Sequence, residues 1–177
     1  EFAAFTDTAY CIGVGNGLDA IEIAMRAKGI GPGDEVITSP MTAAASVIGI
    51  IRAGATPVLA DIDPSTALLD LYSVERCISS RTRAVLLVHL YGQMRNMDAW
   101  VELCAERDLV LLEDCAQSHG ARWHGRHGGT FGLAGGYSFY PTKNLGAIGD
   151  AGAIVTSNVE IAEQARVLRN YGQQARY

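Results

Sequence analysis

The chain has 177 residues, of which 49% are apolar and 19% charged, and its 14 basic and 19 acidic side chains give a net charge of −5. This composition indicates a soluble globular protein of one domain, and it excludes a disordered chain and the basic footprint of a nucleic-acid-binding protein. The apolar stretches fall far short of the roughly 20 residues of a membrane-spanning helix, so we expect neither a membrane segment nor a signal peptide.

Seven short apolar or β-branched runs predict strands, at residues 11–14, 35–39, 56–60, 84–89, 109–113, 136–139 and 153–156. Segments with apolar residues at three- and four-residue spacing lie between the first five runs, and this spacing predicts helices with one apolar face. The apolar faces are Leu18-Ile21-Met25, Ala44-Val47-Ile48-Ile51 and Met97-Trp100-Val101-Cys104. Strands that alternate with helices predict an α/β fold of three layers, with a mostly parallel seven-stranded sheet. No long helix separates the last two runs, so they can be antiparallel neighbours.

The two ends of the chain have the character of interrupted helices. Residues 1–5 look like the middle of a helix, and the chain stops soon after a helix that begins near Val159. We therefore expect residues 1–177 to be one domain from a longer chain.

The cysteines and two of the histidines predict neither disulfides nor a metal site. The cysteines lie in apolar segments without a CxxC pair, which favours small core residues in a reducing compartment, the cytoplasm: Cys11, Cys77, Cys104 and Cys115. His124 and His127 have HxxH spacing, but no carboxylate or thiolate stands nearby in sequence to complete a zinc site. We expect them to be solvated loop histidines.

Residues 13–20, Gly-Val-Gly-Asn-Gly-Leu-Asp-Ala, predict a strand, a glycine turn and a helix start. The backbone N–H groups of such a start, with the positive end of the helix dipole, form an anion site that suits phosphate. The third glycine of a dinucleotide-binding turn is absent. The alternative is a simple helix start.

Two acids follow the apolar run at 109–112, and a carboxylate held at the end of a strand needs a cation. We therefore expect Asp114 to meet a positive group; the alternative is a helix N-cap by Asp114 or Ser118. Lys143, one of two lysines in the chain, lies between a strand and a glycine-rich turn, whereas Lys28 follows a helix. A phosphate turn, an acid at a strand end and a loop lysine are together the requirements of a pyridoxal phosphate site.

Six motifs in order resemble the DegT/DnrJ/EryC1/StrS sugar aminotransferases, which have the aspartate aminotransferase fold. They lie at residues 13–20, 31–37, 88–93, 113–121, 138–147 and 149–153. The resemblance implies pyridoxal phosphate as cofactor, with Lys143 as its Schiff-base lysine and proton shuttle. Asp114 would keep the pyridine nitrogen protonated. Relatives that dehydrate sugars carry histidine at the position of Lys143.

The resemblance also assigns the remaining cofactor contacts. Gln117 would lie near the 3-hydroxyl, and Ser138 and the backbone amides of Gly17 and Leu18 would hold the phosphate. One residue departs from the family pattern, because Ala43 stands where an aromatic ring usually stacks on the cofactor.

The implied reaction is transfer of an amino group, from glutamate or glutamine, to a keto group of a dTDP-type deoxy sugar, with C3 favoured and pyridoxamine phosphate in the second half-reaction. The alternatives are a keto-inositol (scyllo-inosose-type) acceptor and a non-catalytic regulatory or binding module. Family members are about twice as long, so a small C-terminal domain would be missing and the isolated piece could be inactive. A homodimer with shared active sites is implied for the whole protein.

Overall fold

A single seven-stranded sheet organises the chain, and the computed structural model describes residues 1–173 of it. The order across the sheet is β1-β9-β8-β5-β4-β2-β3. The strands are the seven predicted runs with ends moved by one or two residues: β1 (Tyr10–Val14), β2 (Glu35–Thr38), β3 (Thr56–Leu59), β4 (Thr82–Val88), β5 (Val110–Asp114), β8 (Ala134–Ser138) and β9 (Gly152–Thr156).

The direction of each strand decides which ends meet. Strands β3, β2, β4, β5 and β8 are parallel to one another, whereas β9 is antiparallel to both of its neighbours, β8 and β1. The predicted antiparallel pair is therefore confirmed. Two successive reversals leave β1 pointing in the same direction as β8, so the carboxyl ends of β1, β5 and β8 lie at one edge of the sheet.

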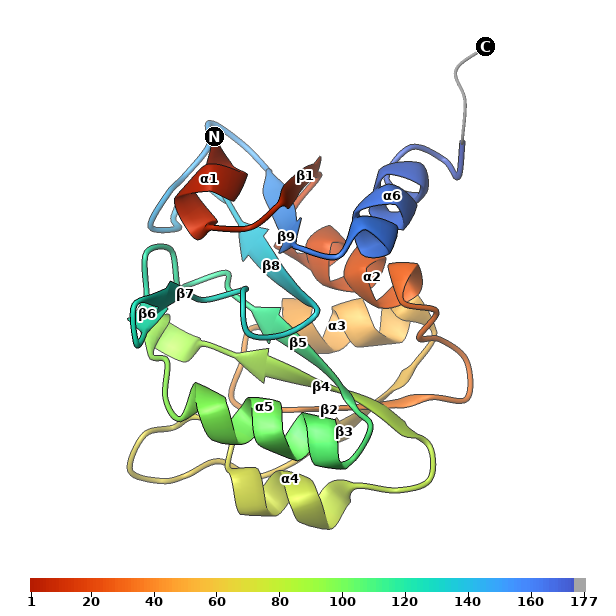
Figure 1. The fold of residues 1–177 in the computed structure, drawn as a ribbon, viewed down its shortest axis with the longest axis vertical. Helices are drawn as coiled ribbons and strands as arrows, with labels where there is room; N and C mark the ends of the chain where they lie inside the picture. Colours follow the sequence, from red (N-terminus) through yellow and green to blue (C-terminus); the bar gives the residue numbers. More distant parts are fainter. Residues whose placement is uncertain (174–177) are drawn as a thin grey trace.

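Helices cover both faces of the sheet (Figure 1). On one face lie α2 (Gly17–Ala27), α3 (Ala44–Ala53) and α6 (Val159–Leu168), and on the other α4 (Leu71–Cys77) and α5 (Met97–Glu106). Side chains alternate along β5, so Leu112 packs with the α2 layer and Leu111 with the α5 layer. The predicted three-layer α/β fold is confirmed.

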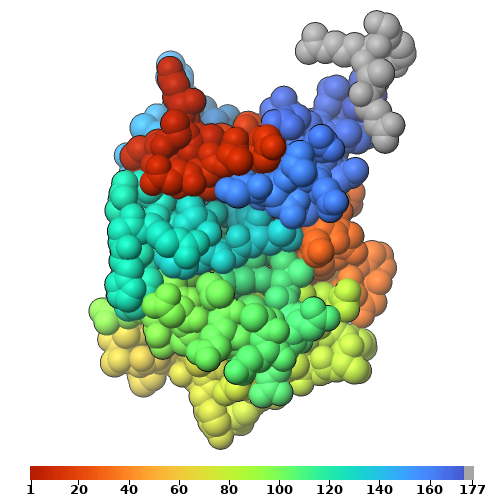
Figure 2. Space-filling view, viewed as in Figure 1, coloured from red at the N-terminus to blue at the C-terminus, as the bar shows by residue number. Residues whose placement is uncertain are grey.

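Two small elements lie outside the predicted pattern, and a third, a short helix at the N-terminus, falls where the sequence has helical character. A hairpin of β6 (Arg122–Trp123) and β7 (Arg126–His127) follows β5, and a 3-10 turn spans Leu90–Gly92. The short helix α1 (Phe2–Thr6) packs Phe2 edge-on against Tyr137, with ring centroids 5.0 Å apart. In Figure 2 the red N-terminal segment lies beside the blue segment that includes α6. Among residues 1–173 no helix is long and apolar enough to cross a membrane.

The predicted apolar face of α3 is wrong. Ile48 and Ile51 are 42% and 56% exposed, and the helix instead buries a row of small residues with one isoleucine: Ser46, Gly49, Ile50 and Ala53. The reason is a close contact with α2, because a Cβ on Gly49 would lie 2.8 Å from Cγ2 of Ile21. Only small side chains let the two helices approach so closely.

The burial of the cysteine and histidine side chains agrees only partly with the prediction. All four cysteines are free, with Cys104 and Cys115 buried and the other two half-buried. His124 is exposed as predicted, but His127 is 1% exposed and was wrongly predicted to be solvated. The ring of Phe5 covers it at 4.8 Å, and neither of its nitrogens has a hydrogen-bond partner among the described residues.

Burial of His127 predicts a pH-dependent stability. Burial lowers the pKa of His127, Arg122 lowers it further and Asp7 opposes this, so the folded state favours the neutral ring. The unfolded chain then binds the proton first, and stability should fall as pH drops below about 6.5. Urea midpoints from about pH 7.5 to about pH 5 should show a shallower slope in His127→Phe than in the parent protein.

Some slope should persist in that variant, because burial also lowers the pKa of His119. The control is His124→Gln at the exposed position of the same hairpin, which should keep the parent slope. An unchanged slope in His127→Phe would contradict the prediction.

Candidate active site

A cavity of about 270 Å³ opens at the edge where the carboxyl ends of β1, β5 and β8 meet. Ligands of open α/β sheets bind at this edge. Most of the residues singled out from the sequence line it, together with neighbours from four segments: Asn16, Gly17, Leu18, Ile21, Ala43, Ala45, Asp114, Ala116, Ser138, Tyr140, Lys143 and Asp150. Gln117 lines a small adjoining pocket that also contacts Asp114 and Lys143.

One end of the cavity is the start of α2. Asn16 caps this helix, and its side-chain oxygen accepts the N–H of Asp19 at 2.8 Å. The N–H groups of Gly17 and Leu18 precede the first intrahelical bond, so they have no partner within the helix. The strand, glycine turn and helix predicted from residues 13–20 thus leave two amides and the positive end of the helix dipole at the cavity.

Ser138, at the end of β8, supplies a hydroxyl beside these amides. It is 7% exposed, and its oxygen accepts the N–H of Tyr140 at 3.3 Å, which leaves its own hydrogen free to donate. A Cβ on Gly17 would lie 2.7 Å from Cβ of Ser138. Glycine at position 17 is therefore what lets the helix start approach Ser138 and form a compact anion cradle.

Asp114 ends β5 at the other side of the cavity and is 5% exposed. Its Oδ1 accepts the N–H of Ala116 at 3.0 Å, and its Oδ2 accepts the hydroxyl of Ser46 at 2.6 Å. It forms no ion pair with any cation among residues 1–173. No helix follows β5, so the alternative of a helix N-cap by Asp114 or Ser118 is wrong. A buried carboxylate with two neutral donors is suited to a positive ligand group.

Lys143 lies on the loop between β8 and β9 and is half-buried. A turn holds its backbone, because its N–H donates to the carbonyl of Tyr140 at 2.8 Å and Ala147 donates to Phe139 at 2.7 Å. No carboxylate of residues 1–173 forms an ion pair with its ammonium group. Lys28, by contrast, is exposed after α2.

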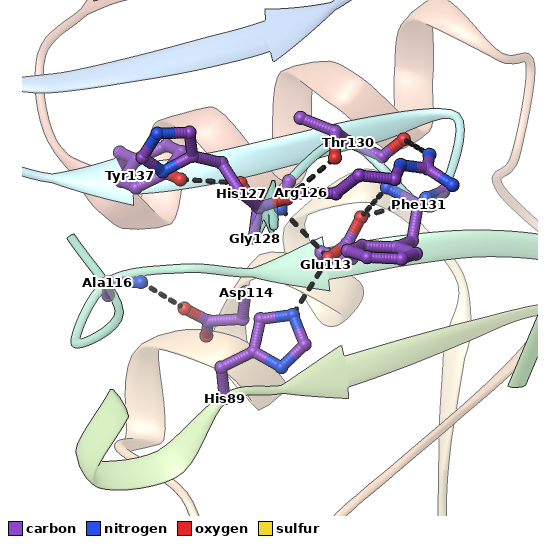
Figure 3. Close-up of polar contacts among 12 residues, drawn as sticks. His89, Glu113, Asp114, Ala116, Arg126, His127, Gly128, Thr130, Phe131 and Tyr137 are labelled. Carbon is purple, nitrogen blue, oxygen red and sulfur yellow. Dashed lines mark hydrogen bonds and ion pairs between the residues drawn. The ribbon is translucent and has the colours of Figure 1, made fainter. Parts of the chain in front are cut away.

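Glu113, beside Asp114, was not singled out from the sequence, yet it organises the opposite side of β5 (Figure 3). It is 1% exposed and accepts four hydrogen bonds of 2.8 Å, from Nε2 of His89 and from the amides of Gly129, Phe131 and Gly132. Burial raises the pKa of Glu113, but the hydrogen bond and charge of His89 and the amide donors outweigh it and lower the pKa. Glu113 is therefore ionised and structural.

The family of the chain follows from comparison with known proteins. Residues 1–177 match the DegT/DnrJ/EryC1/StrS aminotransferase family. The chain belongs to this family. It is 48% identical over 177 residues to the dTDP-3-amino-3,4,6-trideoxy-alpha-D-glucose transaminase of Streptomyces venezuelae, covering 100% of this chain and 47% of that protein. It is also 48% identical over 177 residues to a pleiotropic regulatory protein of Geobacillus stearothermophilus, covering 100% and 48%.

Solved structures of the family share the fold closely. The crystal structure of S. venezuelae DesV in complex with a ketimine intermediate superposes with a TM-score of 0.96 at 48% identity, over 99% of this chain and 47% of that one. NtdA from Bacillus subtilis, with bound cofactor PMP, gives a TM-score of 0.88 at 32% identity, over 94% and 37%. The chain spans about half the length of the curated relatives it matches, 47% and 48% of the two proteins named above.

The cavity of this family member fits pyridoxal phosphate. Its volume lies close to the lower end of the range for small-ligand sites, about 300–1,000 Å³. Two amides without a partner inside α2 and a hydroxyl at one side match a phosphate. The buried carboxylate of Asp114, which pairs with no cation among residues 1–173, matches a pyridinium nitrogen. Lys143 lines the same cavity without an ion pair among the described residues, which matches an aldehyde-binding amine.

Loss of the negative charge of Glu113 should destabilise the folded protein. Glu113→Gln places an amide NH₂ against N–H donors, so the free energy of unfolding should fall by about 3 kcal/mol. Urea denaturation of the full-length protein measures this. Glu102→Gln, on the exposed side of α5, is the matched control and should stay within about 0.5 kcal/mol of the parent protein. Equal stability of both variants would contradict the structural role of Glu113.

Proposed function

We propose that residues 1–177 form the pyridoxal-phosphate-binding large domain of an aminotransferase that aminates a keto group of a dTDP-linked deoxy sugar. One observation supports this most directly. An anion cradle, a carboxylate with no ion pair among the described residues and a half-buried lysine, predicted from three separate motifs, line one cavity. If the glycine turn were only structural and Lys143 only a surface residue, nothing would explain why the cradle, the carboxylate and the lysine lie together.

In this proposal each lining residue has a task. The amides of Gly17 and Leu18 and the hydroxyl of Ser138 bind the phosphate and fix one end of the cofactor. The carboxylate of Asp114 pairs with the pyridine nitrogen and keeps it protonated. Bound pyridoxal phosphate supplies an electron sink for the charge left when the donor's Cα loses its proton. Lys143 binds the aldehyde through Nζ and, once released, carries that proton at Nζ.

Gln117 is positioned for the cofactor's 3-hydroxyl by a backbone contact. Its Oε1 accepts the N–H of Tyr91 at 2.7 Å, so the oxygen is occupied and the amide nitrogen is the end left to donate. Tyr91 adopts a left-handed backbone conformation with φ 57°, and Gly92 follows with φ 76°. This tight turn brings the N–H of Tyr91 to Gln117, which lines the pocket adjoining Asp114 and Lys143.

The acceptor is proposed from the relatives. The names of three of them specify amination at C3 of a dTDP sugar: the enzymes of S. venezuelae, Micromonospora megalomicea and Aneurinibacillus thermoaerophilus. We propose glutamate as donor, with glutamine the alternative, and pyridoxamine phosphate as the form that meets the acceptor. A keto-inositol acceptor is the second candidate within the same chemistry. A regulatory role is the candidate from another class, favoured by the name of the G. stearothermophilus relative.

The assembly and location of the whole protein are part of the proposal. We propose a homodimer with shared active sites, because the phosphate cradle of this chain supplies only two amides and a hydroxyl to a dianion. The four free cysteines support a reducing, cytoplasmic location. Neither a nucleic acid nor a membrane is a proposed partner, since the net charge is −5.

Replacement of Lys143 tests the cofactor assignment. The full-length protein loaded with pyridoxal phosphate should absorb visible light, and borohydride should attach the cofactor covalently to Lys143. Lys143→Ala should lose that absorbance and the adduct, because no amine then binds the aldehyde. Lys28→Ala, at the exposed end of α2, is the control and should keep both. An adduct on Lys28 would refute the assignment.

The acceptor is tested with the amino-loaded enzyme. Mixed with dTDP-3-keto-deoxy sugar, it should return to the pyridoxal spectrum at least about tenfold faster than with a 4-keto isomer or a keto-inositol, since selectivity of that size needs only about 1.4 kcal/mol. Stopped-flow absorbance measures each rate. Faster reaction with the keto-inositol supports the second candidate, and spectral change with donor but with none of the acceptors supports the regulatory one.

A further inference from the structure

Ser46 connects the cavity to the interior of α3. It is the third residue of that helix and 0% exposed. Its Oγ lies 2.6 Å from Oδ2 of Asp114, across 68 residues of sequence, and 2.7 Å from Oγ1 of Thr42. Thr42 lines the small pocket next to the cavity with Lys143 and Asp114. Two hydroxyls and a carboxylate therefore form an unbroken chain.

The direction of the hydrogen bonds in this chain follows from counting protons. An ionised carboxylate only accepts, so the single hydroxyl hydrogen of Ser46 must point to Asp114. The Ser46 oxygen then accepts, and Thr42 is the donor of the second bond. Each donated bond strengthens the next, so both hydroxyls help to fix the carboxylate of Asp114 in one orientation.

Packing alone does not explain a serine at this position. The neighbouring small positions of α3 are alanine or glycine, at 44, 45, 49 and 53, and alanine forms helices better than serine. A buried hydroxyl also costs free energy unless it is bonded. The short hydrogen bond to Asp114 explains why a hydroxyl is present at position 46. The N-terminal turn of α3 also places the positive end of a helix dipole near the same carboxylate.

We propose that Ser46, with Thr42 behind it, is a positioning residue of the active site that holds the carboxylate of Asp114 oriented toward the pyridine nitrogen of the cofactor. This inference rests on the proposed function, because it acts through the pairing of Asp114 with that nitrogen. Without the Ser46 bond, the carboxylate of Asp114 is less well held against the ring nitrogen, so its hydrogen bond to the protonated ring weakens.

The test uses full-length protein with two cofactors, pyridoxal phosphate and its 1-deaza analogue, in which carbon replaces the ring nitrogen. Ser46→Ala should weaken pyridoxal phosphate about three- to tenfold and move the ¹⁵N signal of the ring toward the unprotonated position. Binding of the analogue should not change, because it offers Asp114 no proton. Thr42→Val should give a smaller change in the same direction, and Thr42→Ser should restore the parent values.

Thr38→Val is the matched control, because Thr38 is equally buried and donates to the carbonyl of Leu86 at 2.9 Å without touching Asp114. Both readouts should stay at parent values in that variant. If Ser46→Ala weakens both cofactors equally, the serine is only structural and the inference is overturned. If Asp114→Asn changes both readouts but Ser46→Ala changes neither, the inference also fails while the proposed function stands. If Asp114→Asn itself has no effect, the proposed function is what fails.

Discussion

The alternation of side chains along one strand is the constraint on which this site depends. Glu113 and Asp114 are consecutive in β5, so their carboxylates point to opposite faces of the sheet. Glu113 meets four donors and is saturated, whereas Asp114 meets two and keeps acceptor capacity toward the cavity. Two acids of similar burial thus have different chemistry because one faces a closed loop and the other a ligand-sized space.

The saturated acid also supports the open one. Glu113 holds the ring of His89, and the backbone N–H of His89 donates to the carbonyl of Asp114 at 3.1 Å. The same acid holds the amides of Gly129, Phe131 and Gly132, which form the loop that leads into β8 and so to Ser138. Loss of the Glu113 carboxylate would therefore loosen both ends of the cavity. A ligand site that uses Asp114 thus depends on a fully hydrogen-bonded Glu113 on the opposite face of β5.

The sequence predicted the fold and the ends of the strands well, since apolar runs and turns are local signals. The glycine turn at residues 13–20, Asp114 and Lys143 line one cavity, and the sequence could single them out because their positions follow directly from those strand ends. Contacts between distant segments were not predictable: the bond of Ser46 to Asp114 depends on how α3 packs on β5, and the burial of His127 depends on a cover supplied by Phe5 from the other end of the chain. The misjudged face of α3 has the same origin, because hydrophobicity alone favoured its isoleucines over the small residues that the α2 contact requires.

The small side chain of Ala43 affects which contacts contribute to the free energy of cofactor binding in the proposed site. The described cavity lining contains one aromatic ring, that of Tyr140, which is 50% exposed, while Ala43 and Ala116 present only methyl groups. A stacked ring is worth about 0.5–1.5 kcal/mol beyond its burial, or roughly two- to twelvefold in affinity. A cofactor that lacks this contact on the Ala43 side is held more by its two polar ends. In the proposed function the amides of Gly17 and Leu18 fix the phosphate end, so orientation of the ring at the other end depends on Asp114 and on the hydroxyls that hold its carboxylate in place.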